Sequence, residues 1–331
     1  MSPVLSVQDL SVAMRGANGA VPVLENLSFD VAQGKTMALV GESGCGKSMT
    51  ALAIMRLLPE DFIVTSGKIL LDGEDVLAAA PAALRGLRGN KMSMIFQEPM
   101  TALNPLYTVG DQIGEVLRQH RGLGRRDATE QAIGFLKAVQ IPAAEQRVHA
   151  YPHQLSGGMR QRVMIAMALA CKPKLLIADE PTTALDVTVQ AQIFDLLSAL
   201  QDDTDTAIVL ITHDLGAVAE LADDVAVLYA GRCIEKGASQ RVIAHARHPY
   251  TRGLMACVPH LHLGPAIANV QAELEEIPGM VPPLGARGAE CAFLPRCAFA
   301  IDTCRSRPQP PLDVVGTQAA VSCWRHQEIA P

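Results

Sequence analysis

The amino-acid sequence predicts an α/β fold, and the order of its apolar runs and glycines supports that prediction. GKTMALV (34–40) runs straight into the glycine-rich GESGCGKS (41–48), and MTALAIMRLL (49–58) follows with the apolar density of a buried helix. KLLIAD (174–179) and TAIVLIT (206–212) are continuous apolar runs, as is typical of central parallel strands covered on both faces. A strand, a glycine-rich turn, a helix and further buried strands together indicate a parallel sheet covered by helices.

The segments between these strands differ in periodicity. From about residue 100 to 170 the apolar spacing is helical, and Asp127 followed by Glu130 predicts a helix start. VAVLYAGRCIEKG (225–237) predicts a hairpin that turns at Ala230 and Gly231.

Prolines cluster and regular periodicity fades after about residue 248. We therefore expect a domain at residues 1–247, with a helical subdomain at about 98–168, followed by a C-terminal extension at residues 248–331.

Length and composition indicate a folded chain. The 331 residues are 49% hydrophobic and 19% charged, and the net charge of −6 argues against a nucleic-acid binder. No apolar run approaches the roughly 18 residues that span a bilayer, and MSPVLSVQDL lacks the basic start and apolar core of a signal peptide. We expect a cytosolic chain whose eight cysteines are reduced.

GESGCGKS fits the pattern G-x-x-x-x-G-K-[ST]. The glycines let backbone N–H groups wrap a phosphate chain, and the N-terminus of the following helix favours negative charge. Lys47 is expected to reach the β- and γ-phosphates, and Ser48 to ligate Mg²⁺. The predicted nucleotide-binding residues of this loop are Gly41, Glu42, Ser43, Gly44, Cys45, Gly46, Lys47, Ser48 and Met49.

Two carboxylates end the strand LLIADE (175–180). Asp179 at the strand exit can hold Mg²⁺ through water. Glu180 follows it, where a carboxylate beside the γ-phosphate can act as the general base for the attacking water.

A second anion site is predicted at LSGGMRQR (155–162). Ser156, Gly157 and Gly158 can present a hydroxyl and backbone N–H groups at a helix start. With two phosphate-binding devices in one chain, the sequence closely resembles the ATP-binding cassette (ABC) ATPases. The resemblance implies a RecA-like P-loop NTPase fold, in which this signature loop closes over the ATP held by the other subunit.

The other motifs of that family are present in order. Gln97 in IFQEPM matches the loop whose glutamine senses metal and water, so the resemblance implies a catalytic and Mg²⁺-contacting role. Asp186 in TALD (183–186) matches the loop at the subunit contact, and His213 in LITHD matches the histidine that contacts the γ-phosphate.

The sequence departs from the family at the adenine. ABC ATPases usually stack the base on an aromatic residue upstream of the phosphate loop, but here the matching segment offers Met14 and Arg15, and Phe29 is predicted to lie in a strand. Stacking is worth roughly 1–3 kcal/mol per base. We therefore hypothesise relaxed selectivity for the base.

HPYTRGL (248–254), IPGMVPP (277–283) and QEPMTALNP (97–105) resemble the oligopeptide/dipeptide-type importer ATPases, which include nickel importers. The resemblance implies an ATPase subunit that powers solute import, chiefly of di- or oligopeptides. The alternatives are nickel or another small solute, or a soluble non-transport ABC ATPase. The implied partners are a second ABC ATPase subunit, two transmembrane permease subunits and an extracytoplasmic solute-binding protein, with no nucleic acid. The implied location is the cytoplasmic face of the inner membrane.

Four cysteines crowd the extension with the spacing C-x5-C-x6-C-x18-C. This spacing matches neither structural zinc sites nor ferredoxins, although four thiols in a weakly cored segment suggest a ligand set. The resemblance implies a [4Fe–4S] cluster, with zinc and the absence of metal as open alternatives. A structural or redox-sensing role is favoured over catalysis. The four residues are Cys291, Cys297, Cys304 and Cys323.

Overall fold

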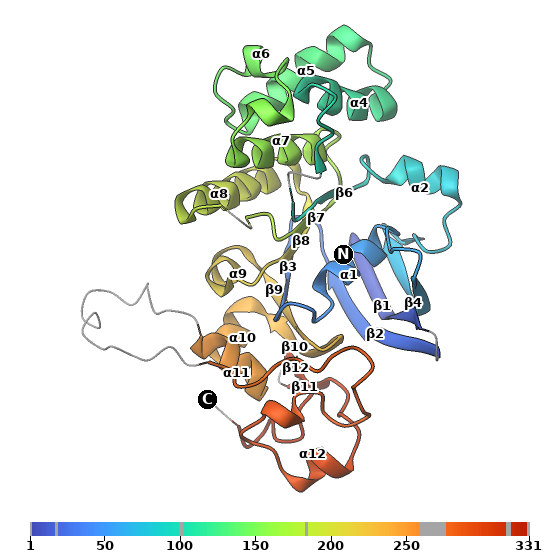
Figure 1. Cartoon of the computed structure of the whole chain (residues 1–331), viewed down its shortest axis with the longest axis vertical. Helices are drawn as coiled ribbons and strands as arrows, with labels where there is room; N and C mark the ends of the chain where they lie inside the picture. Colours follow the sequence, from blue (N-terminus) through green and yellow to red (C-terminus); the bar gives the residue numbers. More distant parts are fainter. Residues whose placement is uncertain are drawn as a thin grey trace, which may run out of the picture.

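The computed structural model describes residues 2–16, 19–98, 102–182, 185–257, 276–315 and 319–329. Its strands form an eight-stranded and a four-stranded sheet. Figure 1 shows the helical part at the top, the large sheet running down the centre, the small sheet to its right and the C-terminal extension at the bottom.

The large sheet has the order β11-β12-β10-β9-β3-β8-β7-β6. Its parallel centre pairs β3 with β8 and β9, β8 with β7, and β7 with β6. Every residue of β3, β7 and β8 is buried, so the predicted central parallel strands are confirmed. The strands are β3 (Thr36–Val40), β6 (Met92–Ile95), β7 (Leu175–Asp179), β8 (Ala207–Ile211), β9 (Asp224–Tyr229), β10 (Arg232–Ala238), β11 (Asp313–Val315) and β12 (Ala319–Val321).

The small sheet is antiparallel, with the order β2-β1-β4-β5. Side chains of this sheet, of α1 and of the large sheet share one apolar core. The strands are β1 (Leu5–Gly16), β2 (Gly19–Val31), β4 (Phe62–Leu71) and β5 (Glu74–Asp75), and the nearby helices are α1 (Lys47–Ile54) and α2 (Pro81–Leu87).

Helix α1 ends earlier than the buried helix predicted at residues 49–58. Its last residue is Ile54, and Arg56 adopts a left-handed φ of 51°. The Arg56 guanidinium donates to the carbonyls of Val76 and Ala79, at 3.2 and 2.6 Å. These bonds to a distant segment stabilise the turn that stops the helix.

The predicted helical region is confirmed, and its apolar side chains pack into a cluster that also includes residues of β7 and β8. The helix start predicted at Asp127 is wrong: the N-cap is Gly124, and Asp127 lies in the first turn of the helix, where a carboxylate still suits the helix dipole. The helices are α4 (Val109–Arg121), α5 (Arg125–Ala138), α6 (Ala144–Arg147), η1 (Pro152–Gln154) and α7 (Gly157–Leu169).

The remaining helices cover the large sheet or belong to the extension. They are α8 (Val187–Thr204), α9 (Leu215–Leu221), α10 (Ser239–Ala244), α11 (Pro249–Ala256), η2 (Leu294–Arg296) and α12 (Asp302–Ser306). The extension adds β12 to the sheet beside β10, and its Phe293 packs with Tyr229 and Tyr250 in a third apolar cluster.

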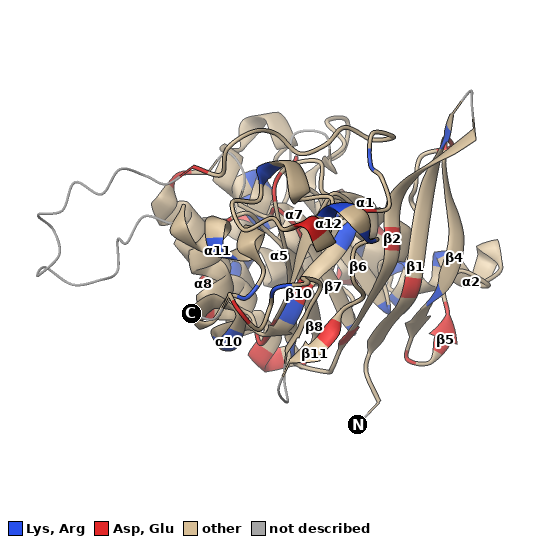
Figure 2. Cartoon of the chain, turned by 90° about the horizontal axis from the view of Figure 1, so that it is seen from below, with Lys and Arg blue, Asp and Glu red and all other residues tan. Residues whose placement is uncertain are grey.

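Among the helices of the described residues, none combines the length and apolar character needed to cross a membrane. In the view of Figure 2, basic and acidic residues are interspersed along the elements. The net charge of −6 is therefore the small difference between 34 acidic and 28 basic residues.

The predicted hairpin turn between β9 and β10 is confirmed at Ala230 and Gly231. We expect Gly231→Ala to lower the free energy of unfolding by about 1–3 kcal/mol. Gly231 has a φ of +80°, and a Cβ atom there would lie 1.9 Å from the carbonyl oxygen of Val23. Urea denaturation measures the change.

Gly134→Ala is the matched control. Gly134 lies on the exposed face of α5 with open space at its Cβ position. This substitution should raise the stability by roughly 0.5–1 kcal/mol. A Gly231→Ala protein as stable as the parent would contradict the close backbone approach at this turn.

Candidate functional site

The phosphate-type loop connects the end of β3 to the start of α1 and depends on its glycines. Gly41, Gly44 and Gly46 have φ values of 148°, 80° and 107°. A Cβ atom at Gly41 would lie 2.2 Å from the carbonyl oxygen of Leu228, and one at Gly46 would lie 2.5 Å from Leu24. The loop therefore needs glycine both for its backbone angles and for its close packing.

Lys47, at the first turn of α1, is buried. Its Nζ donates to the carbonyls of Gly41 and Glu42, at 2.7 and 3.1 Å. The ammonium group thus lies inside the curve of the loop, beside the helix N-terminus, where an anion is favoured.

Ser48 and Asp179 meet, as expected of residues that share a magnesium ion. The Ser48 Oγ donates to Asp179 Oδ1 at 3.1 Å. Asp179 ends β7 and is buried, and desolvation raises the pKa of its carboxyl. A hydroxyl and a carboxylate are hard oxygen ligands of the kind that Mg²⁺ prefers.

Two expected catalytic side chains converge on the carboxylate of a third, Glu180. The Gln97 Nε2 donates to Glu180 Oε2 at 3.0 Å, and the His213 Nδ1 lies 3.6 Å from the same oxygen. Glu180 has a left-handed φ of 47°, and its backbone N–H donates to Ile211 at 2.9 Å. Such a backbone conformation in a non-glycine residue is typical of functional sites.

The second predicted anion site lies on a different part of the molecule. Ser156 is the N-cap of α7, and its Oγ accepts from the backbone N–H of Met159 at 3.3 Å. Ser156 and Gly157 are exposed, and a Cβ atom at Gly158 would lie 3.3 Å from Val189 in α8. In Figure 1, α7 lies in the upper, helical part, well above α1.

Asp186 shares this exposed face. It is the N-cap of α8, and its Oδ1 accepts from Val189 at 3.0 Å. The other expected residues of this loop, at 183–184, lie outside the described part of the chain. The signature loop and Asp186 are therefore held together by the starts of two neighbouring helices.

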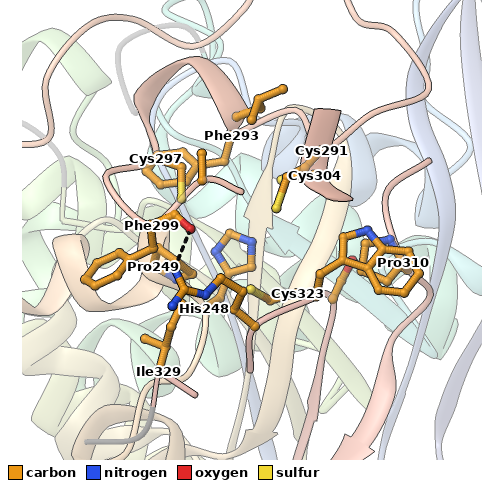
Figure 3. Close-up of a pocket in the computed structure, with 15 residues that line it drawn as sticks. His248, Pro249, Cys291, Phe293, Cys297, Phe299, Cys304, Pro310, Cys323 and Ile329 are labelled. Atoms are coloured by element: carbon orange, nitrogen blue, oxygen red, sulfur yellow. Dashed lines mark hydrogen bonds between the residues drawn. The ribbon is translucent and has the colours of Figure 1, made fainter. Parts of the chain in front are cut away.

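The four clustered cysteines line one cavity of about 20 Å³, drawn in Figure 3. Burial raises the pKa of Cys291 and of Cys323 to about 11, and the neighbouring thiols add to both shifts. Within the described residues, however, no group of three or more His, Cys, Asp or Glu side chains is arranged to hold a metal ion. The four thiols therefore line one cavity without forming a ready-made metal centre.

Sequence reasoning missed two side chains that contact the phosphate loop. The Tyr250 hydroxyl accepts from the Glu42 backbone N–H at 2.8 Å, and Arg296 contacts the Glu42 carboxylate. Both belong to the extension. HPYTRGL did single out Tyr250 as part of a motif, but nothing local in the sequence indicates its partner.

Comparison with known proteins identifies the family to which this chain belongs. Residues 24–183 match the family described as ABC transporter, and residues 234–304 match the one described as oligopeptide/dipeptide transporter, C-terminal region. The chain belongs to the ABC transporter ATPases. ATP is therefore its nucleotide and Mg²⁺ its metal, and ATP hydrolysis is its activity.

Its relatives define the branch of the family. A Brucella melitensis protein named as a peptide import ATP-binding protein is 48% identical over 334 residues, which cover 99% of this chain and 98% of the relative. The dipeptide transport ATP-binding protein DppD of Bacillus subtilis is 46% identical over 331 residues, covering 100% of this chain and 97% of the relative. The dimeric bacterial ABC transporter cassette MJ0796 has a TM-score of 0.63 and 27% identity over 71% of this chain and 98% of its own. The resemblance to peptide-importer ATPases is thereby confirmed.

The segment expected to face adenine lies at the end of β1. Met14 is half-buried and pairs with Val21 on one side and Phe62 on the other. Phe62 packs against the core, and Phe29 is buried in β2. Met14 thus offers a half-buried thioether at the end of β1, and its neighbour Arg15 is exposed.

Stacking of one base on an aromatic ring contributes roughly 1–3 kcal/mol, and this segment offers no such ring. We therefore expect the rate of GTP hydrolysis to lie within about tenfold of the rate of ATP hydrolysis. Met14→Tyr should lower the KM for ATP by about fivefold or more. Steady-state hydrolysis of both nucleotides measures this. A parent protein that strongly prefers ATP, with no gain in the tyrosine variant, would contradict the role of Met14.

Proposed function

We propose that this chain is the ATP-hydrolysing subunit of an importer of di- or oligopeptides. The convergence of Gln97 and His213 on Glu180, next to the Ser48–Asp179 pair, is the observation that carries the hydrolytic part. The peptide cargo is supported by the names of the relatives and by the matched C-terminal region.

Each residue of the site has a distinct task in this proposal. The phosphate loop and Lys47 bind the β- and γ-phosphates, and Ser48, Gln97 and Asp179 hold the magnesium ion. The bound ion neutralises charge on the phosphates. Glu180 accepts a proton from the attacking water, and His213 contacts the γ-phosphate.

His213 suits that task because its side chain is 71% exposed, whereas Glu180 is 17% exposed. The imidazole can therefore reach a nucleotide without breaking buried contacts. Glu180 is held from both sides, by Gln97 and by its own backbone bond to β8. A fixed carboxylate with an exposed histidine beside it fits a base and a phosphate sensor.

A second ATPase subunit completes the site. Ser156, Gly157 and Asp186 are exposed on one face, apart from the chain's own phosphate loop. In this arrangement each signature loop serves the nucleotide of the other subunit, so two chains form two composite sites.

The membrane partners are two permease subunits, to which a solute-binding protein delivers the cargo. A groove of about 880 Å³ in the helical part is lined by Tyr107, Val116 and Met167 among polar residues. Leu106 beside it is 81% exposed. A groove lined mostly by polar and charged side chains, with a few apolar ones and an exposed leucine beside it, suits an amphipathic helix of a permease. The chain then lies at the cytoplasmic face of the inner membrane, and the division at residue 248 separates its ATPase domain from the extension.

We expect Glu180→Gln to lower ATP turnover by about 10²-fold or more, the range for removal of a general base. Glu220→Gln is the matched control, because Glu220 is exposed on α9, outside the site. Phosphate release by the assembled transporter measures the effect. Near-normal turnover in Glu180→Gln would mean that another group acts as the base.

Uptake tests the cargo in the same variants. A strain deleted for this gene, with either the parent or Glu180→Gln restored, is given labelled dipeptides, longer peptides or nickel. The parent should restore peptide uptake and Glu180→Gln should not. Restoration of nickel uptake alone would assign the transporter to a different solute, and restoration of neither would favour a non-transport ATPase.

A [4Fe–4S] cluster in the extension is a separate part of the proposal. The convergence of four thiols on one cavity supports it, while the lack of a metal-ready arrangement among the described residues counts against it. After anaerobic purification we expect about four irons and four acid-labile sulfides per chain. Zinc alone, or no metal, would exclude the cluster. Cys297→Ser should lower that iron and sulfide content, whereas the matched control Cys257→Ser, outside that cavity, should not.

A further inference from the structure

All polar groups of Glu42, the second residue of the phosphate loop, have partners. Its backbone N–H donates to the Tyr250 hydroxyl at 2.8 Å, and its carbonyl accepts from Lys47 at 3.1 Å. Its carboxylate accepts from Arg296 Nη1, at 3.0 Å to one oxygen and 3.1 Å to the other. Two of these three partners, Tyr250 and Arg296, come from the C-terminal extension.

Arg296 is held too firmly to be an ordinary surface cation. Its side chain is 5% exposed. Nε donates to Pro278 at 2.8 Å and Nη2 to Ile277 at 3.1 Å, so the IPGMVPP segment orients the guanidinium. The guanidinium carbon lies 5.8 Å from the ring centroids of both Tyr229 and Phe293. Removal of one partner from an ion pair that includes a buried group leaves the other charge uncompensated, which is strongly unfavourable.

The charge of Glu42 matters because of its place in the sequence. The Glu42 carboxylate, 30% exposed, belongs to the loop that must bind the negative phosphates of ATP. An unpaired carboxylate there would oppose nucleotide binding. Arg296 neutralises it from the side of the extension.

We propose that Arg296 is a positioning residue for nucleotide binding: it cancels the charge of Glu42 and, with Tyr250, fixes the entry of the phosphate loop. The extension therefore sets the affinity of the ATP site within its own chain. In a plain anchoring role the pair would only tie the extension to the core. The double substitution should then weaken nucleotide binding as much as the substitution of Arg296 alone.

The test titrates MgADP, which is not hydrolysed, into the full-length chain by calorimetry. Arg296→Gln should raise the Kd by about tenfold, because it leaves the Glu42 charge uncompensated in the loop. The double variant Glu42→Gln/Arg296→Gln should return the Kd to within about threefold of the parent, since neither charge remains. Arg296→Lys should lie between the parent and Arg296→Gln. The difference in MgADP affinity between the parent and Arg296→Gln should become smaller at high salt, because salt screens the Glu42 charge.

Arg325→Gln is the matched control. Arg325 also lies in the extension, and it donates to Phe299 and Glu328. This variant should leave the Kd for MgADP unchanged. If it weakens binding as much as Arg296→Gln does, general loosening of the extension explains both results and the proposal fails.

Glu42→Gln alone keeps the test decisive if Arg296→Gln does not fold. Removal of the carboxylate leaves the Arg296 cation facing the loop, so MgADP should bind more tightly than to the parent. A Kd in Glu42→Gln that is equal to or higher than that of the parent, or a double variant as weak as Arg296→Gln, would overturn the proposal in favour of plain anchoring.

Discussion

The parallel register of β3, β8, β7 and β6 is the constraint on which the site depends. In a parallel sheet the carboxyl ends of neighbouring strands lie at one edge, where ligands of α/β folds bind. Each of these strands delivers one chemical segment to that edge: the phosphate loop follows β3, Glu180 follows β7, His213 follows β8 and Gln97 follows β6. Any shift in that pairing would separate the carboxylate from the residues that contact it.

The backbone around the phosphate loop is as constrained as the sheet. The Gly231 N–H donates to the Cys45 carbonyl at 2.9 Å, and the Glu25 N–H donates to the Gly231 carbonyl at 2.9 Å. The hairpin between β9 and β10 therefore fastens the loop to the small sheet. Glycine at 231 and glycines in the loop belong to one packing arrangement, because each permits a backbone approach that a side chain would block.

The C-terminal extension shares in this arrangement. β12 pairs with β10, and Phe293 contacts Tyr229 and Tyr250 at centroid distances of 5.3 and 5.4 Å. Arg296 immediately precedes Cys297, so the turn that presents one of the four thiols also presents the guanidinium that reaches Glu42. The state of the thiol-lined cavity and the geometry of the phosphate loop thus depend on the same short turn.

Much of this was predictable from the sequence because it is local. The strand, loop and helix around GESGCGKS and the buried parallel strands follow from patterns of a few residues. The pairing of Ser48 with Asp179 was expected from the two motifs, since both follow strands of one sheet. Local patterns also erred: Asp127 suggested a cap, but Gly124 begins the helix, and α1 stops where Arg56 bonds to a distant segment.

Arg296 and Tyr250 could not be predicted, for a physical reason. Their partner Glu42 lies 254 and 208 positions away, and no periodicity links residues across such separations. An arginine in a proline-rich segment looks like a solvated charge until the fold buries it.

Phosphate binding by the chain's own loop and the contribution of a signature loop therefore have different requirements. Lys47, Ser48, Asp179 and the Arg296–Glu42 pair all lie within one chain, so a single chain has what it needs to bind the phosphates. Ser156 and Gly157 are exposed on a separate face, and in the proposed assembly they would serve the nucleotide site of another subunit. Under the two proposals together, the extension would govern nucleotide binding and assembly would govern hydrolysis, so that ATP could be held before two subunits close.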